Sequence, residues 1–266
     1  IPFGRGNSRS VPMGAVVEEA RRLVARGYAE LVLTGIDLTA YGADLPGAPS
    51  LGTLVRKLLK MVSGLLRLRL SSIDSIEADP ELMRAIAEEE RLMPHFHLSA
   101  QSGDDMILKR MKRRHSRRNT IAFCEDVRRL RPEAAFGADL IAGFPTETEV
   151  MFANTLKLVE EADLTFLHVF PFSPRTGTSA ARMPQLPRPL VKERAARLRN
   201  KGAEQLRNRM NGLVGARKSV LVEARGCGRT ECYASAQLDK PAAPGELMQV
   251  RIRGAAADRL DAIVIS

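Results

Sequence analysis

The sequence predicts an α/β protein in two parts, a partial barrel of alternating strands and helices followed by a small all-β barrel. Helical and strand patterns alternate through the first 172 residues, and the strands are dense in Leu, Val, Ile and Phe, as is typical of βα units around a parallel sheet. After residue 210 the helical pattern stops, and short strands separated by Gly, Pro and Asp turns follow. The order of these two patterns along the chain gives the fold class.

The helices are predicted from apolar residues spaced three and four apart. In the first, Pro12 suits the opening turn and Gly27 the carboxyl-terminal cap. The last opens with Thr146 and Glu149, which predicts a capping box. Helices are expected over residues 13–26, 51–62, 78–89, 104–114, 119–130 and 146–162.

The strands are predicted as short apolar runs between these helices, over residues 29–35, 65–72, 95–100, 134–145 and 164–172. The series begins with a helix, whereas a regular βα series begins with a strand, so we expect a barrel that lacks its first strand. Every strand ends in small or polar residues. Because active sites of such folds lie at the carboxyl ends of the strands, the candidate site belongs there.

Changes in residue composition and in periodicity divide the chain into three segments. Residues 1–172 form the partial barrel. Residues 173–210 hold an irregular, proline-rich linker and then a strongly basic helix from residue 191. Residues 211–266 form the small barrel, of a kind that binds oligonucleotides.

The charge balance indicates a polyanionic partner. The chain carries 41 Lys and Arg against 31 Asp and Glu, a net charge of +10. Such a surplus favours nucleic acid, although arginine-rich helix surfaces in a generally basic proteome give the same number. No apolar run reaches 18 residues and no signal-peptide pattern opens the chain, so we predict a cytoplasmic protein without a membrane partner.

Three polar motifs accompany the strand ends, and each has a structural alternative. The basic run of residues 109–118 can neutralise phosphates or can be a solvated helix end. Gln101 can recognise a ribose or an amino acid, while Ser102 beside it can simply cap a helix. Gly143 allows close approach of the backbone to a ligand, or merely allows a turn.

The cysteines do not predict a metal site within the chain. Cys227 and Cys232 have no histidine near them in the sequence, and Cys124 lies on the apolar side of a predicted helix. All three are interpreted as structural. No Ser-His-Asp order, P-loop or HExxH helix is present, and no general acid–base pair stands out, so a hydrolytic mechanism is not indicated.

Six segments in order resemble the radical S-adenosylmethionine methylthiotransferases that modify tRNA: RGNSRSVP (5–12), LTGIDLTAYG (33–42), LRLSSID (68–74), HLSAQSGDDMILKRMKRRHS (97–116), DLIAGFPTETE (139–149) and FPFSPRTGT (170–178). The resemblance covers essentially the whole chain. It is nearest to the subfamily that adds a methylthio group at C2 of N6-threonylcarbamoyladenosine, next to the anticodon. It implies a partial radical-SAM barrel and a TRAM-like RNA-binding barrel.

The resemblance also implies cofactors and partners. The full-length family uses S-adenosylmethionine, two [4Fe–4S] clusters and an electron donor such as a flavodoxin-type reductant, and its substrate is tRNA. One cluster is held by a CxxxCxxC loop, which this chain lacks. The family places that loop directly before a segment like residues 1–10, so cluster cysteines are expected upstream of Ile1 and the chain alone is expected to be inactive.

The family's site residues are carried over by position. The resemblance implies cofactor contacts from Thr34, Gly35, Ser72, Gln101, Arg114, Gly143, Phe144, Val169 and Phe170. RNA contacts are expected from Arg5, Arg9, Lys112, Arg113, Arg117, Arg118, Arg217 and Lys218. No catalytic side chain is identified.

Three other functions stay open at this point. The chain can be a non-catalytic RNA-binding remnant of such an enzyme. It can act on another adenosine or on a protein. It can also be an unrelated barrel enzyme with another cofactor, because βα units support many chemistries.

Overall fold

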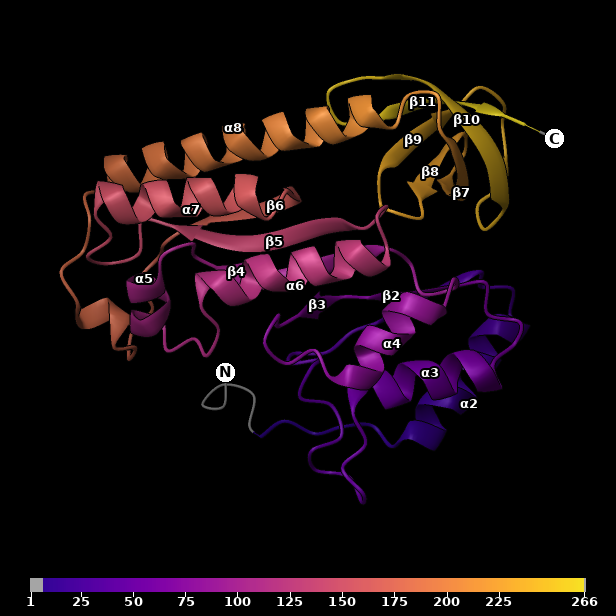
Figure 1. Ribbon diagram of the computed structural model, residues 1–266, viewed down its shortest axis with the longest axis horizontal. Helices are drawn as coiled ribbons and strands as arrows, with labels where there is room; N and C mark the ends of the chain where they lie inside the picture. The colour runs from indigo at the N-terminus through magenta and orange to yellow at the C-terminus, as the bar shows by residue number, and fades with distance from the viewer. Residues whose placement is uncertain (1–6, 266) are drawn as a thin grey trace.

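A computed structural model describes residues 7–265 of the chain (Figure 1). The first part alternates strands and helices, in the order α2 (Met13–Ala25), β1 (Glu30–Leu33), α3 (Leu51–Met61), β2 (Arg67–Leu70), β3 (Ser72–Ile73), α4 (Pro80–Glu88), β4 (His95–Gln101), α5 (Asp105–Arg110), α6 (Arg117–Leu130), β5 (Ala135–Ala142), α7 (Glu149–Glu161) and β6 (Leu164–Pro171). Helices α3, α4, α6 and α7 lie on the outside of the strands. The predicted order of elements is confirmed.

All strands of the first part run parallel and follow the chain order. Strand β1 pairs with β2, and β3, β4, β5 and β6 form a four-stranded sheet. Only Ser71 separates β2 from β3, and Leu68 of β2 bridges to Leu92 just before β4. The two sheets therefore form one curved wall, which confirms a partial βα barrel.

Each strand buries one face under the helices and turns the other to the concave side. In β5, Phe136, Ala138 and Leu140 are fully buried in the main core beneath the helices. Gly137 and Asp139 alternate with them and face the concave side, because successive side chains of a strand point in opposite directions. The concave face therefore carries polar side chains in the interior of the strands as well as at their ends.

One predicted helix cap is wrong, and the cap that was left open for Ser102 does not form. Helix α7 begins after Thr148, whose hydroxyl accepts from the Met151 amide, so Thr146 and Glu149 form no capping box. The carboxylate of Glu147 accepts hydrogen bonds from the Gly143 amide and from Arg194. These two hydrogen bonds stabilise a separate turn ahead of the helix. Helix α5 is capped by Asp104 rather than by Ser102.

The chain ends in a closed five-stranded barrel, ordered β10-β11-β9-β8-β7. Its strands are β7 (Arg217–Ala224), β8 (Cys227–Thr230), β9 (Ser235–Leu238), β10 (Leu247–Ala255) and β11 (Leu260–Val264). The barrel has its own apolar core, with Val220, Val250 and Leu260 fully buried. The predicted small all-β barrel is confirmed.

One long helix joins the two parts. Helix α8 (Arg188–Gly212) follows a loop whose regular structure is the short 3-10 helix η1 (Ala180–Arg182). It begins three residues before the predicted start, because Pro187 and Pro189 suit a first helical turn. The helix packs along β6 and α7 and reaches β10 at its far end (Figure 1). None of the helices in residues 7–265 combines the length and the apolar character needed to cross a membrane.

The small barrel covers the concave side of the sheet at the amino ends of the strands. Tyr233 stacks on His95 with ring centroids 4.4 Å apart and meets Phe166 edge-on at 5.8 Å. Arg67 donates to the Ser219 carbonyl at 2.7 Å, and Arg69 donates to the Glu231 carbonyl at 3.1 Å. Aromatic stacking and buried arginine hydrogen bonds thus attach the barrel to the sheet.

Replacing His95 with phenylalanine should make the fold less sensitive to acid. His95 is 5% exposed, and neither ring nitrogen has a hydrogen-bond partner within residues 7–265. Burial lowers its pKa well below the usual 6.5, and the charge of Arg69 lowers it further, with smaller effects from His97, Arg229 and His168. The unfolded chain therefore binds a proton below about pH 6.5 that the folded chain does not bind, and stability falls as the pH falls.

The measurement for this prediction is urea unfolding between pH 7 and pH 5. The wild-type chain should lose up to about 1.4 kcal/mol per pH unit more than His95→Phe, since one proton is linked to unfolding at that site. Equal slopes for the two proteins would contradict the assignment. Comparison of the two cancels the contributions of the other histidines.

Candidate functional site

The predicted cofactor residues follow the carboxyl ends of parallel strands. In the register of the sheet, Gln101 lies beside Leu140, and Leu140 lies beside Val169. Thr34 and Gly35 follow β1 directly and are exposed. Ser72 begins β3 and lies lower on the wall, opposite His97. The structure therefore gathers most of these residues along one edge, with Ser72 below it.

Gln101 has an unusual backbone conformation. Its φ is +63°, in the left-handed region that residues other than glycine seldom adopt, and its side chain is 8% exposed. The carbonyl of Ala100 accepts from the Ser102 amide at 2.7 Å and lies 3.0 Å from Nε2 of His115. The turn that presents Gln101 is thus held from two sides, and backbone strain of this kind concentrates at binding sites.

His115 positions this turn. Its Nδ1 lies 3.3 Å from Asp74, which follows β3. Burial lowers the pKa of His115, but its hydrogen bonds to Asp74 and to the Ala100 carbonyl outweigh burial, and the pKa is raised. The buried His115 side chain thus connects the ends of β3 and β4. The sequence placed His115 within the basic run and did not distinguish this role.

Gly143 is constrained by the fold around it. Its φ is +76°, its amide donates to Glu147 at 3.0 Å, and a Cβ there would lie 2.7 Å from Val191 on α8. The following Phe144 is buried and meets Phe172 edge-on at 5.2 Å. The structural interpretation of this glycine is therefore supported, and the predicted support of the adenine stays a prediction.

Val169 and Phe170 do not share a face. Phe170 is half exposed, and Val169 packs against the core under the helices. Neighbouring residues of a strand point to opposite sides, so only Phe170 can present its side chain to the concave side. Any contact of Val169 with a ligand there has to come from its backbone.

Arg114 lies at the rim of this edge. Its side chain is 68% exposed and forms an ion pair with Glu77, whose carboxylate also accepts from the Thr39 hydroxyl at 2.8 Å. Glu77 follows β3 in the chain, so the pair lies beside the strand ends. The predicted contact of Arg114 with a carboxylate remains a prediction.

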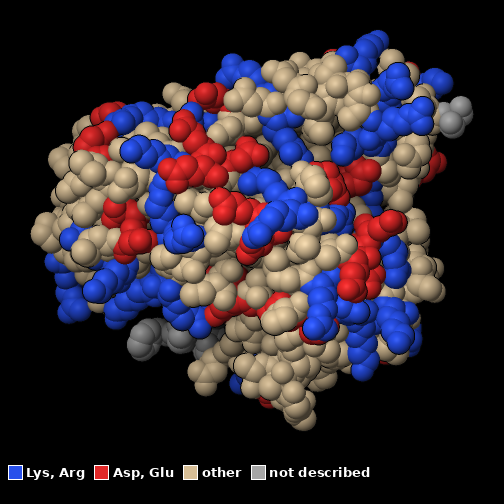
Figure 2. Space-filling model, viewed as in Figure 1, with Lys and Arg blue, Asp and Glu red and all other residues tan. Residues whose placement is uncertain are grey.

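The predicted RNA-binding residues lie in two separate regions. Lys112 and Arg113 are exposed between α5 and α6, and Arg118 is exposed in the first turn of α6, whereas Arg217 and the half-buried Lys218 begin β7 in the small barrel. Figure 2 shows Lys and Arg gathered around α5 and the η1 loop at one end, and again over the small barrel at the other. The predicted RNA-binding residues therefore form two separate groups.

Among the predicted RNA-binding residues, Arg117 and Arg9 differ from the others, and Arg5 lies outside the described residues. Arg117 donates to the carbonyls of Gly103 and Asn154 and pairs with Glu161 at 2.6 Å, so its guanidinium is already committed within the chain. Arg9 is exposed on a segment tied down by Ser10, whose amide donates to Asp44 at 2.9 Å. Arg5 falls outside residues 7–265.

The three cysteines of the described residues lie in two different parts of the fold. Cys124 is buried in α6, and burial raises the pKa of its thiol to about 12. Cys227 and Cys232 belong to the small barrel and are free thiols. An iron–sulfur cluster is held by several cysteine thiolates that converge on one point, so the expectation that this chain alone ligates none stays a prediction.

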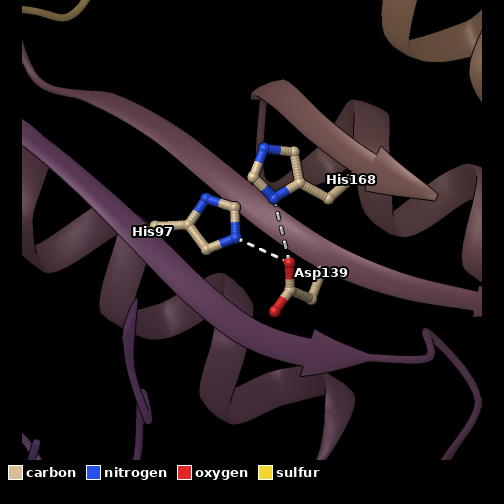
Figure 3. A group of neighbouring side chains, drawn as sticks. All are labelled: His97, Asp139 and His168. Atoms are coloured by element: carbon tan, nitrogen blue, oxygen red, sulfur yellow. Dashed lines mark hydrogen bonds and ion pairs between the residues drawn. The ribbon is translucent and has the colours of Figure 1, made fainter. Parts of the chain in front are cut away.

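A cluster of histidine and carboxylate on the concave face was missed by the sequence analysis. His97, Asp139 and His168 come from β4, β5 and β6 and meet in the middle of the sheet (Figure 3). Burial raises the pKa of Asp139, but the hydrogen bond and charge of His97, and then those of His168, outweigh burial and lower it. The alternation of side chains along each strand could have indicated this group in the sequence, because each of its three residues lies on the strand face opposite its apolar neighbours.

The model of the Radical SAM superfamily matches residues 2–159, more than half of the chain. The chain belongs to the radical SAM superfamily. Among curated proteins, it is 52% identical over 254 residues to the threonylcarbamoyladenosine tRNA methylthiotransferase MtaB of Rickettsia prowazekii, covering 96% of this chain and 60% of the relative. It is 36% identical over 261 residues to a tRNA-2-methylthio-N(6)-dimethylallyladenosine synthase of Erythrobacter litoralis, covering 95% and 58%.

Solved structures agree with the fold. The coproporphyrinogen III oxidase HemN of Escherichia coli, described as a radical SAM enzyme, superposes with a TM-score of 0.52 at 19% identity, over 71% of this chain and 45% of that one. At that identity the likeness concerns the fold alone. The chain spans about three fifths of the length of the two curated relatives above.

Proposed function

We propose that this chain is the S-adenosylmethionine-binding and RNA-binding part of a tRNA methylthiotransferase that acts at C2 of N6-threonylcarbamoyladenosine, next to the anticodon. The observation that carries the proposal is the edge formed by Thr34, Gly35, Gln101 and Gly143, on a sheet attached to a small RNA-binding type of barrel. The 52% identity to a protein of that name supports the substrate.

The residues at the strand edge suit the polar groups of S-adenosylmethionine. The buried amide of Gln101 offers one acceptor and two donors, and Thr34 offers a hydroxyl beside a glycine backbone. Arg114 offers a guanidinium at the rim for a carboxylate, and Phe170 offers an apolar face. When bound in this family, the cofactor supplies radical chemistry. The chain's residues bind it, orient it and limit its access to water.

Iron and sulfide reconstitution of residues 1–266 should give no stoichiometric [4Fe–4S] cluster. The sequence has no CxxxCxxC loop, and its three cysteines lie apart. Visible absorption together with iron and acid-labile sulfide counts would check this. One cluster per chain would contradict the cysteine assignment.

Binding to tRNA and its dependence on salt test the RNA-binding half of the proposal. Replacing Lys112, Arg113 and Arg118 together by alanine should weaken binding and lower the slope of log affinity against log salt by about two to three, since each phosphate contact contributes about 0.7–0.9. Lys57→Ala with Lys60→Ala, on exposed positions of α3, is the matched control. Weak binding that does not depend on salt would refute an RNA partner.

Binding of labelled S-adenosylmethionine separates the proposed enzyme part from a non-catalytic RNA-binding remnant. Equilibrium dialysis should detect binding by the wild-type chain and loss of binding in Gln101→Ala. Binding of tRNA without binding of S-adenosylmethionine would favour the remnant.

The target adenosine is tested with anticodon stem-loops. Loops that carry N6-threonylcarbamoyladenosine or N6-dimethylallyladenosine should compete differently for the chain, with preference for the first. Equal competition would refute the proposed specificity, and no competition by either would favour a protein substrate.

A further inference from the structure

Three side chains on the concave face form a compact group of nitrogen and oxygen atoms. Nε2 of His97 lies 2.9 Å from Oδ1 of Asp139, and Nδ1 of His168 lies 3.2 Å from the same oxygen (Figure 3). All three potential ligand atoms lie within 4.8 Å of one another. Neither the strand-edge site nor the expected cluster cysteines use this group.

The sheet itself assembles the group. Asp139 on β5 lies directly beside His168 on β6, and His97 on β4 lies beside Gly137 on β5. Because Gly137 has no side chain, the His97 ring can lie across β5 toward Asp139, and a Cβ at Gly137 would come within 2.4 Å of His97 Nδ1. Three neighbouring strands therefore fix the three side chains without help from a loop.

We propose that His97, Asp139 and His168 bind one divalent transition-metal ion of the zinc class. Two imidazole nitrogens and one carboxylate oxygen are ligands that such ions prefer, and metal–ligand bonds of about 2.0–2.2 Å place ligand atoms at separations like those here. On binding, each imidazole proton resides on the nitrogen away from the metal, Nδ1 of His97 and Nε2 of His168. Neutral histidines then lose no proton.

The surroundings leave further coordination positions open. The side chain of His97 is 11% exposed and that of Asp139 26%, whereas that of His168 is 64% exposed. The group lies between the strand edge with Gln101 and the layer where Tyr233 stacks on His95. An ion held by three protein ligands with one open side can exchange water for a ligand, as catalytic zinc sites do.

Titration of Zn²⁺ into the chain by calorimetry tests the site, and Co²⁺ absorption reports the ligands. We expect one ion per chain and a cobalt spectrum without a thiolate charge-transfer band. Asp139→Asn should weaken binding by more than the roughly 10- to 100-fold that loss of an outer partner costs, and Gly137→Ala by about tenfold, since it displaces the His97 ring. Circular dichroism would establish that each variant is folded.

Two variants serve as controls. His95→Phe removes a histidine from the same strand face two residues away, and Cys227→Ser removes the partly exposed thiol; both should bind as the wild type does. Absence of stoichiometric Zn²⁺ binding, unchanged affinity in a folded Asp139→Asn, or loss of the site in Cys227→Ser would each overturn the proposal. If Asp139→Asn does not fold, His168→Asn replaces it, because that side chain is mostly exposed.

Discussion

Replacing Arg194 with methionine is expected to lower the free energy of unfolding by about 3–5 kcal/mol, because the change leaves a buried carboxylate without its partner. Arg194 on α8 is 3% exposed, and its guanidinium donates to Oε2 of Glu147 at 2.9 Å and to the Glu147 carbonyl at 2.8 Å. Glu147 is 2% exposed. Urea unfolding at pH 7 measures the loss.

The pH dependence and a neighbouring arginine provide the controls for this result. Burial raises the pKa of Glu147, more than the Gly143 amide and Arg194 lower it, so without Arg194 the carboxyl accepts a proton readily and the loss should shrink at low pH. Arg197→Met, on the same helix and over the same Phe152 ring, should cost less than about 1 kcal/mol, since its side chain is 40% exposed. Equal losses for the two arginines would contradict the buried-pair argument.

Replacing Tyr233 with alanine is expected to loosen the attachment of the small barrel and to cost about 2–4 kcal/mol, somewhat less than a fully buried aromatic residue. The Tyr233 ring contacts His95 and Phe166, and the guanidinium carbons of Arg69 and Arg229 lie 5.1 and 4.2 Å from its centroid. Loss of the ring removes stacking and cation–π contacts together.

Limited proteolysis detects this loosening, because the backbone around Arg67 and His95, which the barrel contacts, becomes accessible when the barrel moves away. Tyr28→Ala is the matched control, since Tyr28 is 50% exposed and its ring contacts Arg26 on the surface. Unchanged cleavage and stability in Tyr233→Ala would show that the barrel is held by Arg67 and Arg69 instead.

The sequence predicted the order of strands and helices well, because apolar periodicity is a local property. Strand β6 was expected over residues 164–172 and ends at Pro171. Helix ends were harder to predict, since distant contacts determine them. Thr146 failed as a cap because Glu147 bonds to Arg194, which lies 47 residues away in the chain.

The candidate site was predicted only in part. A motif locates a strand end, but the face on which a side chain lies depends on the strand's alternation, so Val169 and Phe170 were grouped although they point apart. The group of His97, Asp139 and His168 depends on the register between three strands, which a single sequence does not specify. Ion pairs such as that of Arg117 with Glu161 depend on tertiary structure in the same way.

Helix α8 sets the distance between the two basic regions. Its 25 residues correspond to about 37 Å at 1.5 Å per residue, and it is packed on β6 and α7 along its course and on β10 at its far end. The spacing between the small barrel and the strand edge is therefore fixed rather than adjustable. Under the proposed function, a nucleic acid that contacts both regions would need a shape that matches this span.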